Sequence, residues 1–411
     1  MTNINTKNKE IVPAIIGLGY VGLPLFVRLS KKFKSIGFDI KLKRINKLKK
    51  GIDENKEFTS KEILHNKNSI ISSKKSNLKK ANFYIVCVPT PINKNFSPNL
   101  KCLEDAAKII STVLKKGDIV FFESTVYPGV TETIGKQILE KKTKLKINKD
   151  FYIGYSPERI NPGDKEHSVE KIKKIVAIST NNKDILYKTY KVYQSVTQSI
   201  IKSKSIRNAE AAKVIENIQR DLNIGLFNEI FKLCEKTNLN YQEVIDLAST
   251  KWNFHKYSYG LVGGHCLPVD PYYLAHFARK NKINLDIVLA GRKTNNDMVI
   301  FFIKYIKKKL IKEKIDIKKD KICFYGLTYK KNVPDFRNSL AIKIVEYFNN
   351  INNNIYIEDP YISKDKLKKL RFKKLKTTQQ LKYLIVLVKH KEIYSLTKKN
   401  KNIKILDVFN N

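Results

Sequence analysis

The chain has 411 residues, 42% of them hydrophobic, a length that suits two or three domains with a sizeable core in each. Its formal net charge of +42 comes from lysines spread along the whole chain, which argues against a nucleic-acid-binding face and favours the attraction of an anionic substrate. No leader pattern opens the sequence and no apolar run approaches the roughly 20 residues that span a bilayer, so we expect a cytoplasmic protein without a membrane anchor.

Apolar runs alternate with helix-like segments in the first half of the chain. The run at 11–17 ends in glycines and is followed by a helical pattern and a second short strand at 37–40, which together predict the opening of a βαβ unit. Continuous apolar strands of this kind are typical of a parallel sheet covered on both faces. Further runs of the same type lie at 83–89, 118–125 and 151–158.

The pattern changes in the second half of the chain. From about 205 to 237 apolar residues recur every three or four positions, which predicts a long central helix. Strands return at 321–327, 354–360, 383–388 and 402–408. We therefore predict an α/β protein with two Rossmann-like, doubly wound domains joined by a long central helix. The expected domains are 1–204, a central helical domain at 205–315, and 316–411.

The segment GLGYVG directly follows the first predicted strand and opens a helix. Its glycines allow a tight turn and let backbone amides approach a pyrophosphate at the helix N-terminus. Asp39 ends the next strand about twenty residues later, where a carboxylate binds both ribose hydroxyls and repels a 2′-phosphate, so NAD is favoured over NADP. Arg44 keeps a phosphate contact open as an alternative. The predicted cofactor-binding residues here are Gly17, Gly19, Tyr20, Val21, Gly22, Asp39 and Arg44.

A second glycine-rich stretch, GGHCLPVDP, places Cys266 four residues before Asp270. A thiolate is an effective nucleophile toward an aldehyde, and glycines let substrate and cofactor approach the sulfur. The five cysteines contain no CxxC pair, which predicts reduced thiols and no metal site. A lone cysteine usually fills space in a core. Beside a carboxylate in a dinucleotide-binding protein, it also supplies what the oxidation of an aldehyde to an acid requires.

Along nearly its whole length the sequence resembles the UDP-glucose/GDP-mannose dehydrogenase family. The segments that carry the resemblance are GLGYVGLPL, VPTPIN, ESTVYPGVTE, YSPERINPGD, AEAAKVIENIQRDLNIGLFNE, KWNFHKYSYGLVGGHCLPVDPYYL and GLTYKKNVPDFRNS. Several are most similar to the branch that oxidises UDP-N-acetylhexosamines in Vi-type capsule and O-antigen synthesis. The resemblance implies NAD-dependent, four-electron oxidation of UDP-N-acetylglucosamine at carbon six to the uronic acid. UDP-N-acetylmannosamine and UDP-glucose stay open as substrates.

The same resemblance assigns roles to individual residues. It makes Cys266 the nucleophile, lets Lys213 and Asn217 hold the reacting oxygen from one helical face, and places Asp270 near Lys213 to act on a bound water. It further implies that 1–204 binds NAD and 316–411 binds UDP. Thr125 places a water and Glu158 serves hydrolysis or substrate binding. The remaining implied contacts are Thr90, Thr125 and Arg337 with the cofactor, and Glu158, Arg159, Lys213, Asn217, Gly263 and Lys330 with the substrate.

Two positions depart from the family pattern, and one apolar stripe is longer than a bridging helix requires. Phe26 stands where alanine is usual, which questions the packing of the first helix. Tyr259 stands where proline is usual, which questions the shape of the sugar pocket. Arg292 is a weaker candidate for substrate contact. The apolar stripe at 222–231 exceeds what a bridging helix needs, so we expect a homodimer.

Overall fold

The computed structural model describes residues 10–66, 68–159, 170–376, 381, 383–394 and 403–409. The chain divides into two compact units: unit 1 comprises Met1–Ile215 and Tyr272–Lys282, and unit 2 comprises Glu216–Pro271 and Ile283–Asn411. Two helices take part in both units, α7 (Ile206–Thr237) and α9 (Asp270–Lys280). Within the described ranges, each helix is too short or too polar to cross a membrane.

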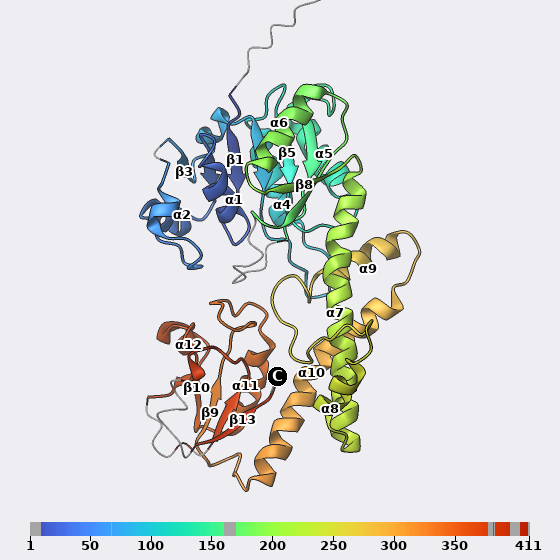
Figure 1. Cartoon of the computed structure of the whole chain (residues 1–411). Helices are drawn as coiled ribbons and strands as arrows, with labels where there is room; N and C mark the ends of the chain where they lie inside the picture. Colours follow the sequence, from blue (N-terminus) through green and yellow to red (C-terminus); the bar gives the residue numbers. More distant parts are fainter. Residues whose placement is uncertain are drawn as a thin grey trace, which may run out of the picture. The chain divides into compact units, whose positions relative to one another are not determined.

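Unit 1 is built on an eight-stranded sheet in the order β3-β2-β1-β4-β5-β6-β7-β8 (Figure 1). The first six strands follow the order of a Rossmann sheet. Neighbouring strands are parallel except β6 and β7, an antiparallel pair that the sequence did not predict. The strands are β1 (Pro13–Ile16), β2 (Ile36–Phe38), β3 (Ile70–Ser72), β4 (Phe83–Val86), β5 (Ile119–Phe122), β6 (Tyr152–Tyr155), β7 (Lys173–Ile178) and β8 (Ser199–Ser203).

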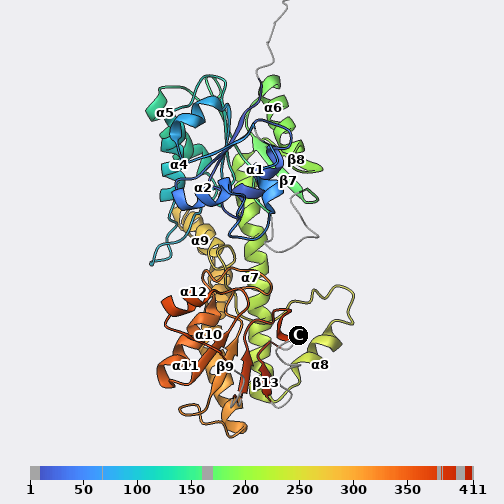
Figure 2. The same ribbon diagram turned by 90° about the vertical axis from the view of Figure 1, so that its left-hand side faces the viewer.

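Helices cover both faces of this sheet, with α1 and α6 on one side and α4 and α5 on the other (Figure 2). Strands β1, β4 and β5 are therefore buried throughout, which explains their continuous apolar sequence. Phe26 of α1 fits because Gly37 on β2 has no side chain; a Cβ there would come within 3.0 Å of the ring. The elements are α1 (Gly22–Leu29), α2 (Leu42–Lys49), α3 (Ser60–Ile63), η1 (Lys75–Lys80), α4 (Lys101–Ser111), η2 (Thr131–Gly135), α5 (Lys136–Thr143) and α6 (Lys183–Gln194).

Unit 2 contains a parallel five-stranded sheet in the order β11-β10-β9-β12-β13. This sheet and the long helix α7 confirm the predicted fold class of two Rossmann-like domains with a central helix. The strands are β9 (Ile322–Tyr325), β10 (Ile355–Glu358), β11 (Lys373–Lys374), β12 (Tyr383–Val386) and β13 (Lys404–Asp407). The helices besides α7 and α9 are α8 (Tyr241–Ala248), α10 (Asp286–Lys312), α11 (Leu340–Ile351) and α12 (Lys364–Lys369).

The predicted apolar stripe of α7 is largely used inside unit 2. Phe227 and Phe231 are each 3% exposed and pack in the same core as α10 and β9. Tyr259 stacks on Phe231 with ring centroids 3.8 Å apart, so this departure from the family pattern belongs to the core of unit 2. Leu226 is 53% exposed and lies outside that core.

Candidate active site

The glycine loop between β1 and α1 turns back on itself. Gly17 has a φ of +95°, and a Cβ on Gly22 would lie 1.8 Å from the Gly17 carbonyl oxygen, so both positions require glycine. Tyr20 is half-buried in this loop, and Val21 precedes the first residue of α1. At exposed Gly19, a Cβ would meet no atom of the described residues within 4 Å. The loop thus presents open backbone at a helix N-terminus, where anions bind.

Asp39 is fixed beside this loop by two backbone N–H groups. Its Oδ2 accepts from Leu18 at 2.9 Å and its Oδ1 accepts from Lys41 at 2.8 Å. Arg44 is buried; its Nε donates to the Leu18 carbonyl at 3.0 Å and its guanidinium pairs with Asp53 at 3.0 Å. The arginine therefore supports the loop from within. The open backbone and the carboxylate fit the pyrophosphate and ribose of NAD.

Two predicted threonines lie together at the carboxyl edge of the unit 1 sheet. The order of the chain reverses between β1 and β4, and ligands of open α/β sheets bind at such a switch point. Thr90 follows β4, and its Oγ1 donates to the carbonyl of Thr125, which follows β5, at 2.7 Å. The Tyr273 hydroxyl donates to the Thr90 carbonyl at 3.0 Å. Strand ends thus bring Thr90 and Thr125 to the edge that carries the glycine loop.

Glu158 belongs to a buried charge cluster that the sequence did not reveal. The Nζ atom of Lys174 lies 2.8 Å from Glu123 and 3.1 Å from Glu158. Burial raises the pKa of the Glu123 carboxyl, with Lys174 opposing the shift and Glu158 reinforcing it. Glu158 also accepts from the Arg159 N–H at 2.6 Å. The rest of the YSPERINPGD motif, at 160–164, lies outside the described residues.

The loop that carries Cys266 leads directly into α9. Its carbonyl accepts from the N–H of Asp270 at 2.9 Å, so the half-buried cysteine sits one turn before the start of this helix. Asp270 is 1% exposed, and its Oδ2 accepts from Asn217 of α7 at 2.5 Å. The structure thus joins Asn217 and Asp270 next to the cysteine loop. Lys213, one turn earlier on α7, is 8% exposed and belongs to unit 1.

The cysteine loop rests on the segment that follows β9. The Asn338 amide donates to the Gly264 carbonyl at 3.0 Å, and Gly264 has a φ of +87°. A Cβ on Gly263 would come within 2.9 Å of the Tyr329 Cβ, so the two segments approach through glycine. Lys330 is half-buried next to Tyr329. The predicted substrate residues Gly263 and Lys330 therefore lie on segments in direct contact.

His265 and Asp335 extend this site beyond the predicted residues. The Nδ1 atom of His265 lies 3.6 Å from the Cys266 Sγ, and its Nε2 lies 3.6 Å from an Asp335 oxygen. Arg337 contacts the same Nε2 and donates to Asp335 at 2.6 and 3.0 Å. Burial opposes the charge on His265, but hydrogen bonds to Asp335 and Cys266 outweigh it and raise its pKa to about 9. Burial likewise opposes ionisation of Asp335, but His265 and Arg337 hold its pKa well below the usual range.

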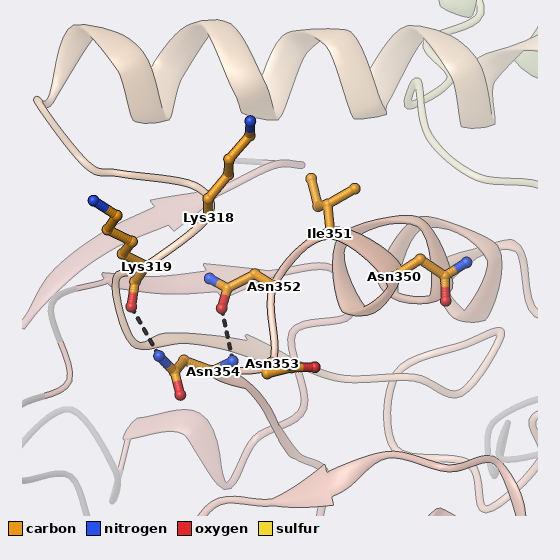
Figure 3. A pocket seen from close by; sticks show the side chains of 7 residues that line it. All are labelled: Lys318, Lys319, Asn350, Ile351, Asn352, Asn353 and Asn354. Carbon is orange, nitrogen blue, oxygen red and sulfur yellow. Dashed lines mark hydrogen bonds between the residues drawn. The ribbon is translucent and has the colours of Figure 1, made fainter.

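A pocket of about 360 Å³ lies elsewhere on unit 2, at the amino end of β10 (Figure 3). Open α/β sheets bind their ligands at the carboxyl ends of the strands, which is the opposite edge. None of the predicted site residues lines it. Its lining residues are Lys318, Lys319, Asn350, Ile351, Asn352, Asn353 and Asn354.

Comparison with known families gives matches over most of the chain. Three models of the UDP-glucose/GDP-mannose dehydrogenase family match in succession. They are its NAD binding domain at 12–197, its central domain at 207–297, and its UDP binding domain at 323–410. The glycine loop and Asp39 fall in the first range, Cys266 in the second, and Lys330 and Arg337 in the third.

Individual proteins are similar over comparable lengths. The chain is 44% identical over 359 residues to a UDP-N-acetyl-D-glucosamine 6-dehydrogenase of Pseudomonas aeruginosa, covering 86% of this chain and 84% of that protein. Its identity to the protein of the same name from Salmonella typhi is 43% over 361 residues, with 88% and 84% covered. The solved structure of a UDP-D-ManNAc dehydrogenase from Pyrococcus horikoshii superposes with a TM-score of 0.83 at 30% identity, covering 96% of this chain and 94% of that one.

Proposed function

Because the chain belongs to the UDP-glucose/GDP-mannose dehydrogenase family, we propose that it is a UDP-N-acetylglucosamine 6-dehydrogenase that forms the uronic acid. Family membership makes it an NAD-dependent nucleotide-sugar dehydrogenase. The observation that carries the choice of sugar is the 44% identity to the Pseudomonas aeruginosa enzyme over 359 residues, against 33% over 355 residues to the UDP-N-acetyl-D-mannosamine dehydrogenase of Pyrococcus horikoshii. The product would feed the synthesis of a capsule or O-antigen polysaccharide in the cytoplasm.

The proposal assigns the two ligands to different parts of the chain. The glycine loop would hold the NAD pyrophosphate, Asp39 its ribose hydroxyls, and Thr90 and Thr125 the remainder of the cofactor. Bound NAD supplies the hydride acceptor for each of the two oxidations. Residues 316–411 would bind the UDP group, with Lys330 reaching the sugar. The central segment at 205–315 would present the cysteine loop and the dimer contact.

The first oxidation converts the carbon-six hydroxyl to an aldehyde. Asn217 would hold the reacting oxygen, and a water or base beside Lys213 and Asp270 would take its proton. The hydrogen bond of 2.5 Å between Asn217 and Asp270 supports this role, because it would hold in place the amide that we assign to the substrate oxygen. The positive charge of Lys213 would stabilise the developing alkoxide.

The second oxidation passes through Cys266. Its sulfur would add to the aldehyde carbon, giving a thiohemiacetal; loss of a hydride to the acceptor and of the hydroxyl proton to a base would turn this into a thioester. A water held by Thr125 and by Glu158 or Asp270 would then cleave the thioester to the acid. Covalent capture keeps the aldehyde from leaving between the two steps. Cys266 lies half-buried beside Asp270 and His265, as a nucleophile that must be reached by substrate requires.

A panel of UDP-sugars tests the choice of substrate. Initial rates of NADH formation are measured with UDP-N-acetylglucosamine, UDP-N-acetylmannosamine, UDP-glucose and GDP-mannose at equal concentrations. We expect the highest kcat/KM with UDP-N-acetylglucosamine, by at least about tenfold, which corresponds to about 1.4 kcal/mol of transition-state binding. A higher value with the mannosamine epimer or with UDP-glucose would reassign the substrate within the family.

We also propose that the enzyme is a homodimer. The exposed apolar side chains of unit 2 support this, because a stable interface buries such groups. Trp252 is 92% exposed, Leu247 66% and Leu226 53%. Light scattering after gel filtration should give twice the chain mass of 47.6 kDa. Trp252→Ser should shift the protein toward the monomer, and a monomeric native protein would contradict the proposal.

A further inference from the structure

Within unit 2, Cys266 and Asp335 lie at the two different ring nitrogens of His265. We propose that His265 is a further catalytic residue: it takes the proton of the Cys266 thiol and holds the sulfur as a thiolate, while Asp335 orients and stabilises the resulting imidazolium. This inference deepens the proposed function and rests on the proposed nucleophilic role of Cys266. A thiol must lose its proton before it attacks an aldehyde, and the proposal assigns this activation to His265 and Asp335, two residues outside the predicted site.

The geometry that carries the proposal involves both ring nitrogens of His265. Nδ1 faces the Cys266 sulfur at 3.6 Å, and Nε2 faces the Asp335 carboxylate at 3.6 Å. Gly264, the residue before His265, has a φ of +87°, a backbone conformation that favours glycine. The Tyr329 ring, 6.3 Å from the imidazole, flanks the group.

The charges around the imidazole favour its protonated form. Arg337 donates to both oxygens of Asp335, so this carboxylate stays ionised and faces the ring as a full negative charge. Arg337 also contacts Nε2 and opposes the imidazolium, and burial opposes it as well. Asp335 and Cys266 outweigh both effects, since the pKa of His265 is raised to about 9. A cation next to a thiol favours the thiolate.

The step conserves atoms and charge. The proton on the Cys266 sulfur moves to Nδ1 of His265. The sulfur then donates an electron pair to carbon six of the aldehyde, and the π pair of the C=O bond moves to oxygen. This oxygen takes the proton back from the imidazolium, so His265 ends neutral and the product is the thiohemiacetal. No oxidant or further reactant enters.

The pH dependence of thiol alkylation tests the proposal on the full chain. Cys102 is the exposed cysteine, so all proteins carry Cys102→Ser; Cys87, Cys234 and Cys323 are buried. The rate of Cys266 alkylation by iodoacetamide is followed between about pH 5 and 10 by mass spectrometry of its peptide. We expect a midpoint below the value of about 8.5 of an ordinary cysteine.

His265→Gln should move that midpoint up toward about 8.5 and slow alkylation near pH 6.5 by roughly tenfold or more. Asp335→Asn should move it in the same direction by less, because the imidazole stays but loses its counter-charge. His265→Asn repeats the test with a smaller side chain if the glutamine variant does not fold, as judged by circular dichroism. An unchanged midpoint in folded histidine variants would overturn the proposal.

The assay contains neither sugar nor NAD, so it separates this inference from the proposed function. A shifted midpoint in a protein that oxidises no UDP-sugar would leave the activation of Cys266 in place and overturn the assigned activity. Two NADH per sugar with an unshifted midpoint would support the activity and overturn the role of His265. In an active enzyme, loss of the histidine should also lower kcat more at about pH 6.5 than at about pH 9, where the thiolate forms unaided.

Discussion

Alanine at Gly22 and at Gly19 should separate the fold of the glycine loop from its ligand. At Gly22, a Cβ would lie 1.8 Å from the Gly17 carbonyl oxygen, and both atoms belong to backbone that has no rotamer to adjust. At Gly19 a Cβ would approach no atom in the described part of the chain within 4 Å, and its φ lies outside the left-handed region. Gly22→Ala therefore overpacks the loop, whereas Gly19→Ala adds a methyl group to open space.

The expected magnitudes differ accordingly. Overpacking costs about 1–3 kcal/mol, and we expect the upper end for Gly22→Ala because the contact must open from 1.8 Å to at least 3.0 Å. For a domain of this size, about 3 kcal/mol lowers the Tm by roughly 6–12 °C. Gly19→Ala should change stability by no more than about 0.5 kcal/mol, as surface substitutions usually do. Its NAD affinity should nevertheless fall at least about tenfold, because the methyl group occupies the approach of the pyrophosphate.

Thermal unfolding measures the stability loss in Gly22→Ala, and isothermal titration with NAD measures the affinity loss in Gly19→Ala. Gly22→Ala shows what strain does in the same loop, since its added Cβ meets the Gly17 carbonyl instead of open space. Native NAD affinity in Gly19→Ala would refute the assignment of the pyrophosphate to this loop. A native Tm in Gly22→Ala would refute the packing argument.

Two further predictions concern buried charges on α7. Burial raises the pKa of Glu210 to about 7, although N–H groups at 129–131 oppose the shift, so its contribution to stability is full below about 4.5 and lost as pH rises through about 7. Urea titrations at several pH values should show the free energy of unfolding falling by up to about 3 kcal/mol in the native chain as pH rises through this range. In Glu210→Gln the dependence on pH should be flatter. Equal pH dependence in the two proteins would contradict the raised pKa of Glu210. Asp221 pairs with buried Arg292 at 2.5 Å, so Asp221→Leu should lower the free energy of unfolding by about 3–5 kcal/mol. Adding Arg292→Met to Asp221→Leu should recover part of this stability. If the stability losses of the two single variants simply add in the double variant, the two side chains do not form the proposed ion pair.

Much of the fold was predictable because its strands are buried on both faces. The runs that became β1, β4, β5 and β6 are continuous and apolar, and the strands observed lie inside the predicted ranges. Strands β7 and β8 escaped prediction because lysines and serines interrupt their apolar runs: β7 begins with two lysines, and β8 has a serine at each end and a lysine at its fourth position. The antiparallel pairing of β6 with β7 depends on tertiary contacts that no local pattern records.

The candidate site was predictable where a motif fixes backbone geometry. Gly17 and Gly22 have the steric constraints that the GxGxxG spacing implies, and NAD as the cofactor is confirmed by the family match. Pairings between segments distant in sequence were not predictable. Arg44 pairs with Asp53 rather than standing open to a phosphate, since only the folded loop brings the two side chains together.

The same limit applies to the surroundings of Cys266. His265 stands next to Cys266 in the sequence and Asp335 stands two residues before Arg337, so both lay inside recognised motifs. Their significance depends on contact between two loops separated by about seventy residues, a separation at which local patterns carry no information. Arg292, a weak candidate for substrate contact, is 1% exposed and paired with Asp221.

The central claim is that Cys266 captures the aldehyde from the first oxidation and carries the same sugar carbon through the second. The most direct measurement is the number of NADH molecules formed per UDP-N-acetylglucosamine consumed, in the native chain and in Cys266→Ser. We predict two NADH and one uronic acid per sugar for the native chain, and no acid for the variant. A single NADH with free aldehyde from the native chain, or full acid formation by Cys266→Ser, would contradict the account.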